Sequence, residues 1–386
     1  MCADVVDMKF QKFLLGLEKR VPEFTFVDHD KKPVIKLGIA ITLFFKKSAT
    51  LEKKRRIIEC YRRFREEFGE FLCFQRHEFT NMKRYTPENI QKVEEAILSV
   101  AEGQLSGWDI SDAKGQTYAP DYLINYLDSS WDDSNGYLSV TFPWHFMKSE
   151  EGITRIHEWL IYLCKQLEPD SGECGYCLAL PRSYHEYEPM EYRLAKRYHS
   201  LQVNSTVHMQ SKNYNDAIRS INWFTVLGTP FIKRLGGEEW VTKILSRCKD
   251  IEIERYANGL IIRLGHYPDL SLLADDVPEA YTFLNQFIRP IRVKPSKADS
   301  FHHYGQGQFN KQSTIEWYSR YDKKPLAVTP LQAGTPALVS GFWTTRSRPD
   351  MEMFMAQGTV APDELGQTSG TTLWELVREA ESVSDS

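Results

Sequence analysis

Residues 218–245 constrain the fold more than any other stretch, because they combine an apolar strand pattern with two sharp chain breaks. Bulky residues alternate from Ile221 to Leu227 and favour a strand. Gly228-Thr229-Pro230 ends that strand, since proline tolerates only the first turn of a following helix. Gly236-Gly237 then separates two short helices. The predicted order of strand, turn, helix, Gly-Gly joint and helix is architectural, without a nucleophile, a metal-ligand set or a phosphate-binding loop.

The rest of the chain predicts strands and helices in similar measure. Strand patterns occupy residues 34–45, 71–75, 137–142, 175–180, 251–256 and 260–264, and Asn258-Gly259 indicates a tight hairpin between the last two. Helical patterns occupy residues 8–18, 51–68, 90–100, 153–167, 189–201 and 277–288, with Thr86 and Ser149 as N-caps. These elements predict an α+β fold of mixed sheets with packed helices. One arrangement that fits the pattern is a pair of related split βαβ halves.

Composition limits the functional class. The 386 residues are 42% hydrophobic and 26% charged, with a formal net charge of −4. A general nucleic-acid binder would need a basic excess, so direct nucleic-acid binding is not expected. No signal peptide is recognisable, and no run approaches the roughly 18 apolar residues of a membrane span. Seven cysteines, an odd number, fit a reducing compartment. We therefore expect a cytoplasmic protein that does not enter a membrane.

Residues 108–133 are the strongest candidate for a partner-binding surface. They interleave aromatic and acidic side chains around a single base, Lys114. Aromatic anchors supply contact area at low entropic cost, and carboxylates steer a basic partner. Two alternatives stay open: a solvated loop with its aromatic side chains folded under it, and a divalent-cation site, which the spacing of the acids fits less well. The candidate residues are Trp108, Asp109, Asp112, Tyr118, Asp121, Tyr122, Tyr126, Asp128, Trp131, Asp132 and Asp133.

Other reactive residue types do not form a recognisable catalytic or metal site. Cys174 and Cys177 form a Cys-x-x-Cys pair, but the residues that follow continue a strand, whereas a redox pair draws its low thiol pKa from a helix start. His185 and Glu186 favour a surface loop, and His302-His303 a solvated pair. Because the sequence contains no hydrolase, P-loop or dinucleotide motif, we expect no enzymatic activity, cofactor or metal. A Cys-x-x-Cys oxidoreductase remains the alternative.

The amino-acid composition of the chain changes near residue 294. Residues 294–311 are rich in Lys, Gly, Gln, Ser and His and predict a linker, to which we assign residues 297–324. Residues 325–386 contain many Gly, Pro and Thr residues around short apolar clusters, which is typical of a small β-rich module. The predicted organisation is therefore a first domain over residues 1–296, a linker over 297–324 and a C-terminal module over 325–386.

A family resemblance accompanies the pattern of residues 218–245. The order Arg219, Ser220, Asn222-Trp223, Thr225, Leu227-Gly228 and Leu235-Gly236-Gly237 resembles the signature of the TsiV family of type VI secretion immunity proteins. The resemblance extends more weakly over residues 34–293, and the spacing of Gly, Pro and Trp over residues 333–374 is similar to a tail domain of several type VI immunity proteins. The signature is one of fold and carries no catalytic residues.

The resemblance implies a function that composition alone does not give. It implies an immunity protein that binds a cognate effector toxin, a nuclease that degrades DNA or RNA, and occludes its active site or substrate cleft without turnover. A non-catalytic adaptor that recruits another protein through the C-terminal module is a further alternative.

Overall fold

The computed structural model describes residues 2–77, 81–101, 104–128, 135–275, 277–302, 305–322, 331–337, 339–345, 347–364 and 370–379. Within these residues, eleven strands form one continuous sheet in the order β10-β11-β9-β8-β2-β7-β6-β5-β3-β4, with β1 paired to β2. The described strands are β1 Phe26–Val27, β2 Pro33–Phe45, β3 Phe74–His77, β4 Lys83–Arg84, β5 Ser106–Ser111, β6 Leu123–Asp128, β7 Gly136–Pro143, β8 Ser171–Ala179, β9 Phe224–Gly228, β10 Ile251–Tyr256 and β11 Gly259–Leu264.

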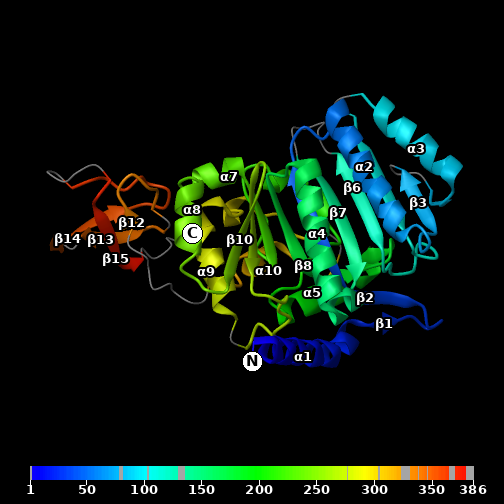
Figure 1. Cartoon of the computed structure of the whole chain (residues 1–386), viewed down its shortest axis with the longest axis horizontal. Coiled ribbons are helices and arrows are strands. Elements are labelled where there is room, and N and C mark those ends of the chain that lie inside the picture. The colour runs from blue at the N-terminus through cyan, green and yellow to red at the C-terminus, as the bar shows by residue number, and fades with distance from the viewer. Residues whose placement is uncertain are drawn as a thin grey trace.

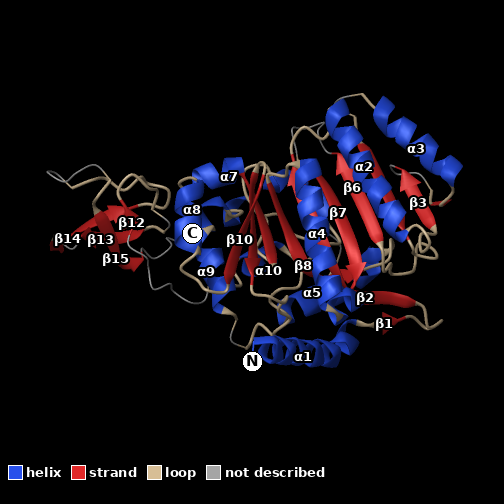
Figure 2. Cartoon of the chain, in the orientation of Figure 1, coloured by secondary structure: helices blue, strands red, loops and turns tan. Residues whose placement is uncertain are grey.

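The pairings between these strands are antiparallel, including the long ladders that join β2 to β7 and to β8. Helices pack around the sheet (Figures 1 and 2), which confirms the predicted α+β class. The two expected halves share this single sheet instead of packing as separate units, because β2 pairs with β8. The described helices are α1 Cys2–Arg20, α2 Leu51–Phe68, α3 Pro87–Ser99, α4 Glu150–Leu167, α5 Glu188–Arg197, α6 Val207–Gln210, α7 Thr229–Arg234, α8 Glu238–Leu245, α9 Glu279–Phe287 and α10 Lys311–Tyr318.

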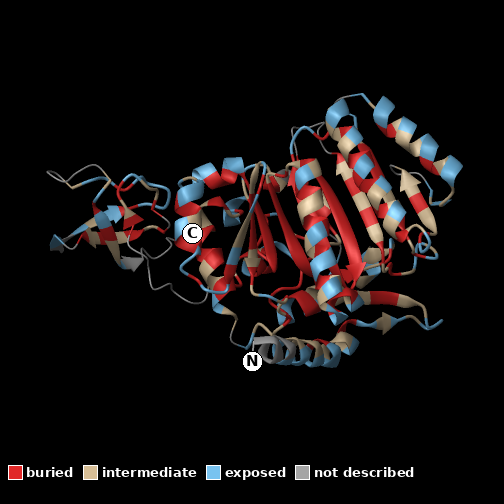
Figure 3. Ribbon diagram, viewed as in Figure 1, coloured by how far each residue is buried: buried red, intermediate tan, exposed pale blue. Residues whose placement is uncertain are grey.

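Helices α2 and α4 cover one face of the sheet (Figure 1). Their starts are capped as expected: the Ser149 hydroxyl accepts from the Gly152 N–H at 3.0 Å, and Thr50 plays the same role for α2. Because side chains alternate along a strand, every second residue of β5 to β7 points at these helices. Trp108 of β5 stacks on Tyr61 of α2 with ring centroids 4.2 Å apart. The helix-covered face is consequently an aromatic core, and Figure 3 shows that the strands beneath the helices are largely buried.

The other face is covered over β2, β8 and β9 by the chain that follows α5 and by the segment that ends in α10. Tyr214 packs on Phe44 of β2 with ring centroids 4.8 Å apart, and its hydroxyl lies 3.2 Å from that of Tyr318 in α10. Over β3, β5, β6 and β7 the same face is only partly covered and lines a cleft. The sheet therefore has one closed and one open region on this side.

The expectation of a linker over residues 297–324 is wrong for its described part, residues 297–302 and 305–322. Phe301, Phe309 and Trp317 are 0%, 2% and 3% exposed and belong to the main core. Asn310 starts α10 with a capping box. Polar residues make up most of the segment, so it looks like a linker although the rings of Phe301, Phe309 and Trp317 are buried.

Residues 218–245 fold in the predicted order. The strand starts at Phe224, later than expected, and α7 and α8 follow, separated by Gly236 and Gly237 with φ of 102° and 94°. Together with α9 and the β10–β11 hairpin, these helices enclose a second hydrophobic core that includes Trp240. The stretch is thus part of the scaffold.

Residues 331–379 form a separate sheet in their described part. Its strands are β12 Leu331–Gln332, β13 Gly341–Thr345, β14 Arg348–Met355 and β15 Leu373–Glu379, in the order β12-β15-β13-β14. Trp343 and Trp374 lie in its small core, and the sheet is set to one side of the main body (Figure 1). The expected β-rich fold of this part of the chain is confirmed.

Candidate functional site

The open region of the sheet forms a cleft of about 370 Å³. Its floor consists of alternate residues of β5, β6 and β7, whose neighbours in sequence point at α2 and α4 on the opposite face. In β7, Tyr137, Ser139 and Thr141 line the cleft, whereas Phe142 packs against Trp159 of α4. The residues that follow β8 form the facing wall with Arg182 and Tyr184. Strand alternation therefore places polar side chains on an otherwise apolar sheet.

A cluster of two arginines and one carboxylate lies in this cleft. Asp109 Oδ2 accepts from Arg76 Nε and from Arg182 Nη1, each at 3.0 Å, and Arg76 Nη2 lies 2.9 Å from the same oxygen. Asp109 and Arg76 face each other across the antiparallel β3–β5 ladder. The side chains of Arg76, Asp109 and Arg182 are 17%, 26% and 39% exposed. Burial raises the pKa of the Asp109 carboxyl, and the neighbouring Arg76 guanidinium opposes that rise. We call this group the cleft cluster.

The structure divides the predicted partner-binding residues into three groups. Trp108, Tyr122, Tyr126 and Asp128 are buried, at 0%, 9%, 1% and 0% exposure. Asp109, Asp112, Tyr118 and Asp121 are partly exposed, and Trp131, Asp132 and Asp133 lie outside the described residues.

The buried group corrects the expectation of a row of aromatic anchors. Trp108 and Tyr126 belong to the core that packs under α2 and α4, so they do not present their rings to a partner in this structure. Ser48 donates to the buried Asp128 carboxylate at 2.6 Å.

The partly exposed acids also have partners within the chain. Lys36 Nζ lies 2.8 Å from Asp121 Oδ2. Asp112 Oδ1 accepts from the backbone N–H groups of Asp121 and Tyr122, both at 2.9 Å. These contacts leave less free negative charge than the composition of residues 108–133 suggested.

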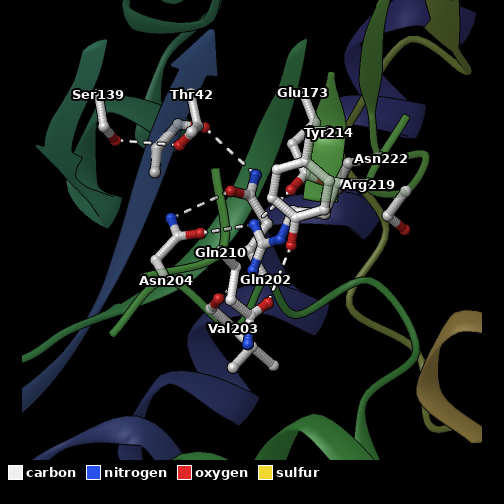
Figure 4. Close-up of polar contacts among 12 residues, drawn as sticks. Thr42, Ser139, Glu173, Gln202, Val203, Asn204, Gln210, Tyr214, Arg219 and Asn222 are labelled. Atoms are coloured by element: carbon white, nitrogen blue, oxygen red, sulfur yellow. Dashed lines mark hydrogen bonds and ion pairs between the residues drawn. The ribbon is translucent and has the colours of Figure 1, made fainter. Parts of the chain in front are cut away.

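A second arginine–carboxylate cluster lies under the closed region of the same face (Figure 4). Arg219 Nη1 donates to Glu173 Oε1 at 2.6 Å and to Asn204 Oδ1 at 3.1 Å. The two charged side chains are 2% and 1% exposed. Arg219 also donates to the Val203 carbonyl. We call this group the buried cluster.

The other residues of the family signature support this cluster. Asn222 Nδ2 donates to the Ser200 carbonyl at 2.7 Å. A Cβ added at Gly175 would lie 2.0 Å from Asn222 Oδ1, so only glycine allows this close approach. Arg320 donates to the Ser220 hydroxyl at 2.9 Å. The signature therefore ties the strands to residues 199–222 and 297–322, which explains why it is one of fold.

His302 is a further correction, because the expected solvated side chain is 2% exposed. Its Nδ1 accepts from the Phe309 N–H at 3.2 Å, which assigns the proton to Nε2, 3.0 Å from Glu191. His303 lies outside the described residues. The histidine is a structural link between the late segment and α5.

The Cys-x-x-Cys pair lacks the geometry of a redox site. Cys174 and Cys177 are three residues apart on β8, so they point to opposite faces of the sheet. Both are free and buried, and burial raises the pKa of each thiol above its ordinary value. Neutral, separated thiols do not favour disulfide exchange.

Sequence reasoning missed the two arginines that partner Asp109. Arg76 and Arg182 lie 33 and 73 residues from Asp109 along the chain, and neither is part of a motif. The register of β3 against β5 is the signal that would have paired Arg76 with Asp109.

None of the helices in the described part of the chain is long and apolar enough to cross a membrane.

Comparison with known proteins identifies the family of this fold. The TsiV family model, described as type VI immunity for VRR-NUC, matches residues 56–321. Among solved structures, the Pseudomonas aeruginosa T6SS protein PA0821 has a TM-score of 0.69 at 20% sequence identity, over 81% of this chain and 91% of that chain. At that identity the likeness shows the fold alone. No curated protein matches the chain. Because the family match spans more than half of the sequence and includes the buried cluster and α10, the chain belongs to the TsiV family of type VI immunity proteins for VRR-NUC.

Proposed function

We propose that this chain binds a VRR-NUC effector of a type VI secretion system and keeps that nuclease from its nucleic-acid substrate, with no substrate turnover of its own. The observation that carries the proposal is the match of residues 56–321 to a family described as type VI immunity for VRR-NUC. Binding without catalysis requires only a stable, complementary surface. An interface of about 1,600 Å² is the ordinary size for such an inhibitor.

The contact surface in this proposal contains the partly exposed members of the predicted stretch: Asp109, Tyr118 and Asp121. Asp109 and Tyr118 line the cleft, and Asp121 lies close by, next to the lining residue Pro120. Two contacts support this choice, because they hold acidic side chains in place before binding: strand register pairs Asp109 with Arg76, and Lys36 pairs with Asp121. Preorganised groups lose little conformational entropy when a partner docks.

Co-expression of the chain with an active VRR-NUC effector encoded beside its gene tests the proposal. We expect cells that make both proteins to grow and keep intact DNA, and cells that make the effector alone to lose viability. A chain ending at Asp322 keeps the buried segment and lacks the C-terminal module, and we expect it to protect as well, since the family match ends at residue 321. DNA degradation that continues in cells with a soluble, folded full chain would contradict the proposal.

A further inference from the structure

The cleft cluster carries more positive charge and more hydrogen-bond donors than its single carboxylate satisfies. Arg76 Nε and Arg182 Nη1 both donate to Oδ2 of Asp109, each at 3.0 Å. Two guanidinium groups present ten N–H donors, and these hydrogen bonds use two of them. With one negative charge against two positive charges, the cluster has a net charge of about +1. It is therefore complementary to an anion.

Asp109 holds the two guanidinium groups in place without filling the cleft. A planar guanidinium paired along one edge keeps donors on its other edge, where it binds a second carboxylate with fixed geometry. Arg182 is the more accessible of the two, with 39% of its side chain exposed. Among the described lining residues, Asp109 is the acidic one. An incoming carboxylate thus meets arginine donors first.

The surroundings fit a protein side chain better than a nucleic acid. Tyr118, Tyr137 and Tyr184 line the cleft together with apolar residues such as Leu178 and Pro181. Tyrosine and arginine are the residue types most enriched at the energetic centres of protein interfaces. A volume of about 370 Å³ accommodates one or a few side chains, and the overall net charge of −4 disfavours a polyanion.

We propose that this cleft receives an acidic side chain of the VRR-NUC effector, an aspartate or glutamate on a protruding loop, whose carboxylate binds to Arg182 and Arg76. The inference rests on the proposed immunity function and names the feature of the partner that is recognised. The sequence predicted the opposite arrangement of charge, in which acidic residues of this chain bind basic residues of the partner. The arginines bind, and Asp109 positions them.

Charge reversal at Arg182 tests this assignment. The affinity of the chain for a nuclease-inactive form of the VRR-NUC effector encoded beside its gene is measured by titration calorimetry. We expect Arg182→Glu to raise the dissociation constant by at least about tenfold, because it replaces an attractive charge with a repulsive one. Arg182→Ala removes the donors without adding charge, and we expect a smaller loss in the same direction.

Arg255→Glu is the matched control. Arg255 lies on β10 at the far edge of the sheet with 71% of its side chain exposed, so the same change of charge is made away from the cleft. We expect its affinity to stay within about twofold of the wild type. Unfolding in urea, measured for each variant, separates loss of binding from loss of fold.

A charge swap identifies the partner residue. Among effector variants with single Asp→Lys or Glu→Lys changes, one should regain affinity for Arg182→Glu while binding the wild type poorly. Unchanged effector affinity in folded Arg182→Glu and Arg182→Ala would overturn the cleft assignment and leave the immunity function standing. A wild-type chain that does not bind the effector would overturn both. Duplex DNA that binds the wild type and not Arg182→Glu would assign the cleft to nucleic acid and refute the inference.

Discussion

The two arginine–carboxylate clusters on the same face of the sheet differ in what covers them. The buried cluster, Arg219 with Glu173, is 2% and 1% exposed beneath residues 199–222 and the segment that ends in α10. The cleft cluster, Arg76 and Arg182 with Asp109, is 17%, 39% and 26% exposed. One cluster pairs its two charges with each other away from solvent, and the other leaves donors toward solvent.

This difference separates architecture from recognition. A buried ion pair depends on both partners, because removal of one leaves a charge without compensation in a medium of low polarity. A solvated pair contributes little to folding, since water replaces the lost contact. The cover over the sheet, more than the residue types, therefore decides which cluster is available to a partner.

Among the variants that compare the two clusters, Arg219→Ala is expected to lower the free energy of unfolding the most. It leaves the Glu173 carboxylate buried without its cation, and we expect a loss of about 3–5 kcal/mol in the free energy of unfolding. The matched variant Arg182→Ala should lose less than about 1 kcal/mol, because its pair is partly exposed. Urea unfolding of both variants measures the difference. Equal losses would remove the distinction between the clusters.

A smaller effect is expected at an intermediate pair, Asp322 with Arg292, whose side chains are 24% and 11% exposed. Burial alone would raise the pKa of Asp322, but hydrogen bonds and charge from Arg292 outweigh burial and hold that pKa below its ordinary value of 3.8. The stabilisation is then fully present above 3.8 and is lost as the pH falls through the lower folded value.

Asp322→Asn should accordingly lower the free energy of unfolding by about 1–2 kcal/mol near neutral pH. The difference from the wild type should shrink in acid, where the wild-type carboxyl is protonated. Asp30→Asn is the control, since Asp30 is 51% exposed. Urea unfolding across a pH series tests the prediction, and a difference that grows in acid would contradict the assigned direction of the pKa shift.

Local patterns were sufficient to predict much of the scaffold. The apolar stripe of residues 51–68 and the caps at Thr86 and Ser149 predicted α2, α3 and α4, because helix periodicity and capping are properties of neighbouring residues. The Asn258-Gly259 turn predicted the β10–β11 hairpin in the same way. Features that depend only on nearby sequence were therefore accessible.

The site depended on contacts between distant residues. Trp108 and Asp109 are neighbours in the chain, but their side chains point to opposite faces of the sheet. Composition does not distinguish the two faces, so a core residue and a cleft residue were both predicted to bind the partner. Arg76 joins Asp109 only through the register of β3 against β5. His302 looked solvated because its buried partner Glu191, on α5, lies 111 residues away along the chain. Composition could not supply these contacts.

The most direct test of the central claim is the nuclease activity of the purified VRR-NUC effector, titrated with the purified chain on a DNA substrate. If the chain acts by binding the effector and shielding its substrate site, cleavage should fall linearly and stop near equimolar amounts, with the chain itself unchanged. Full cleavage at a large molar excess of folded chain would contradict the account.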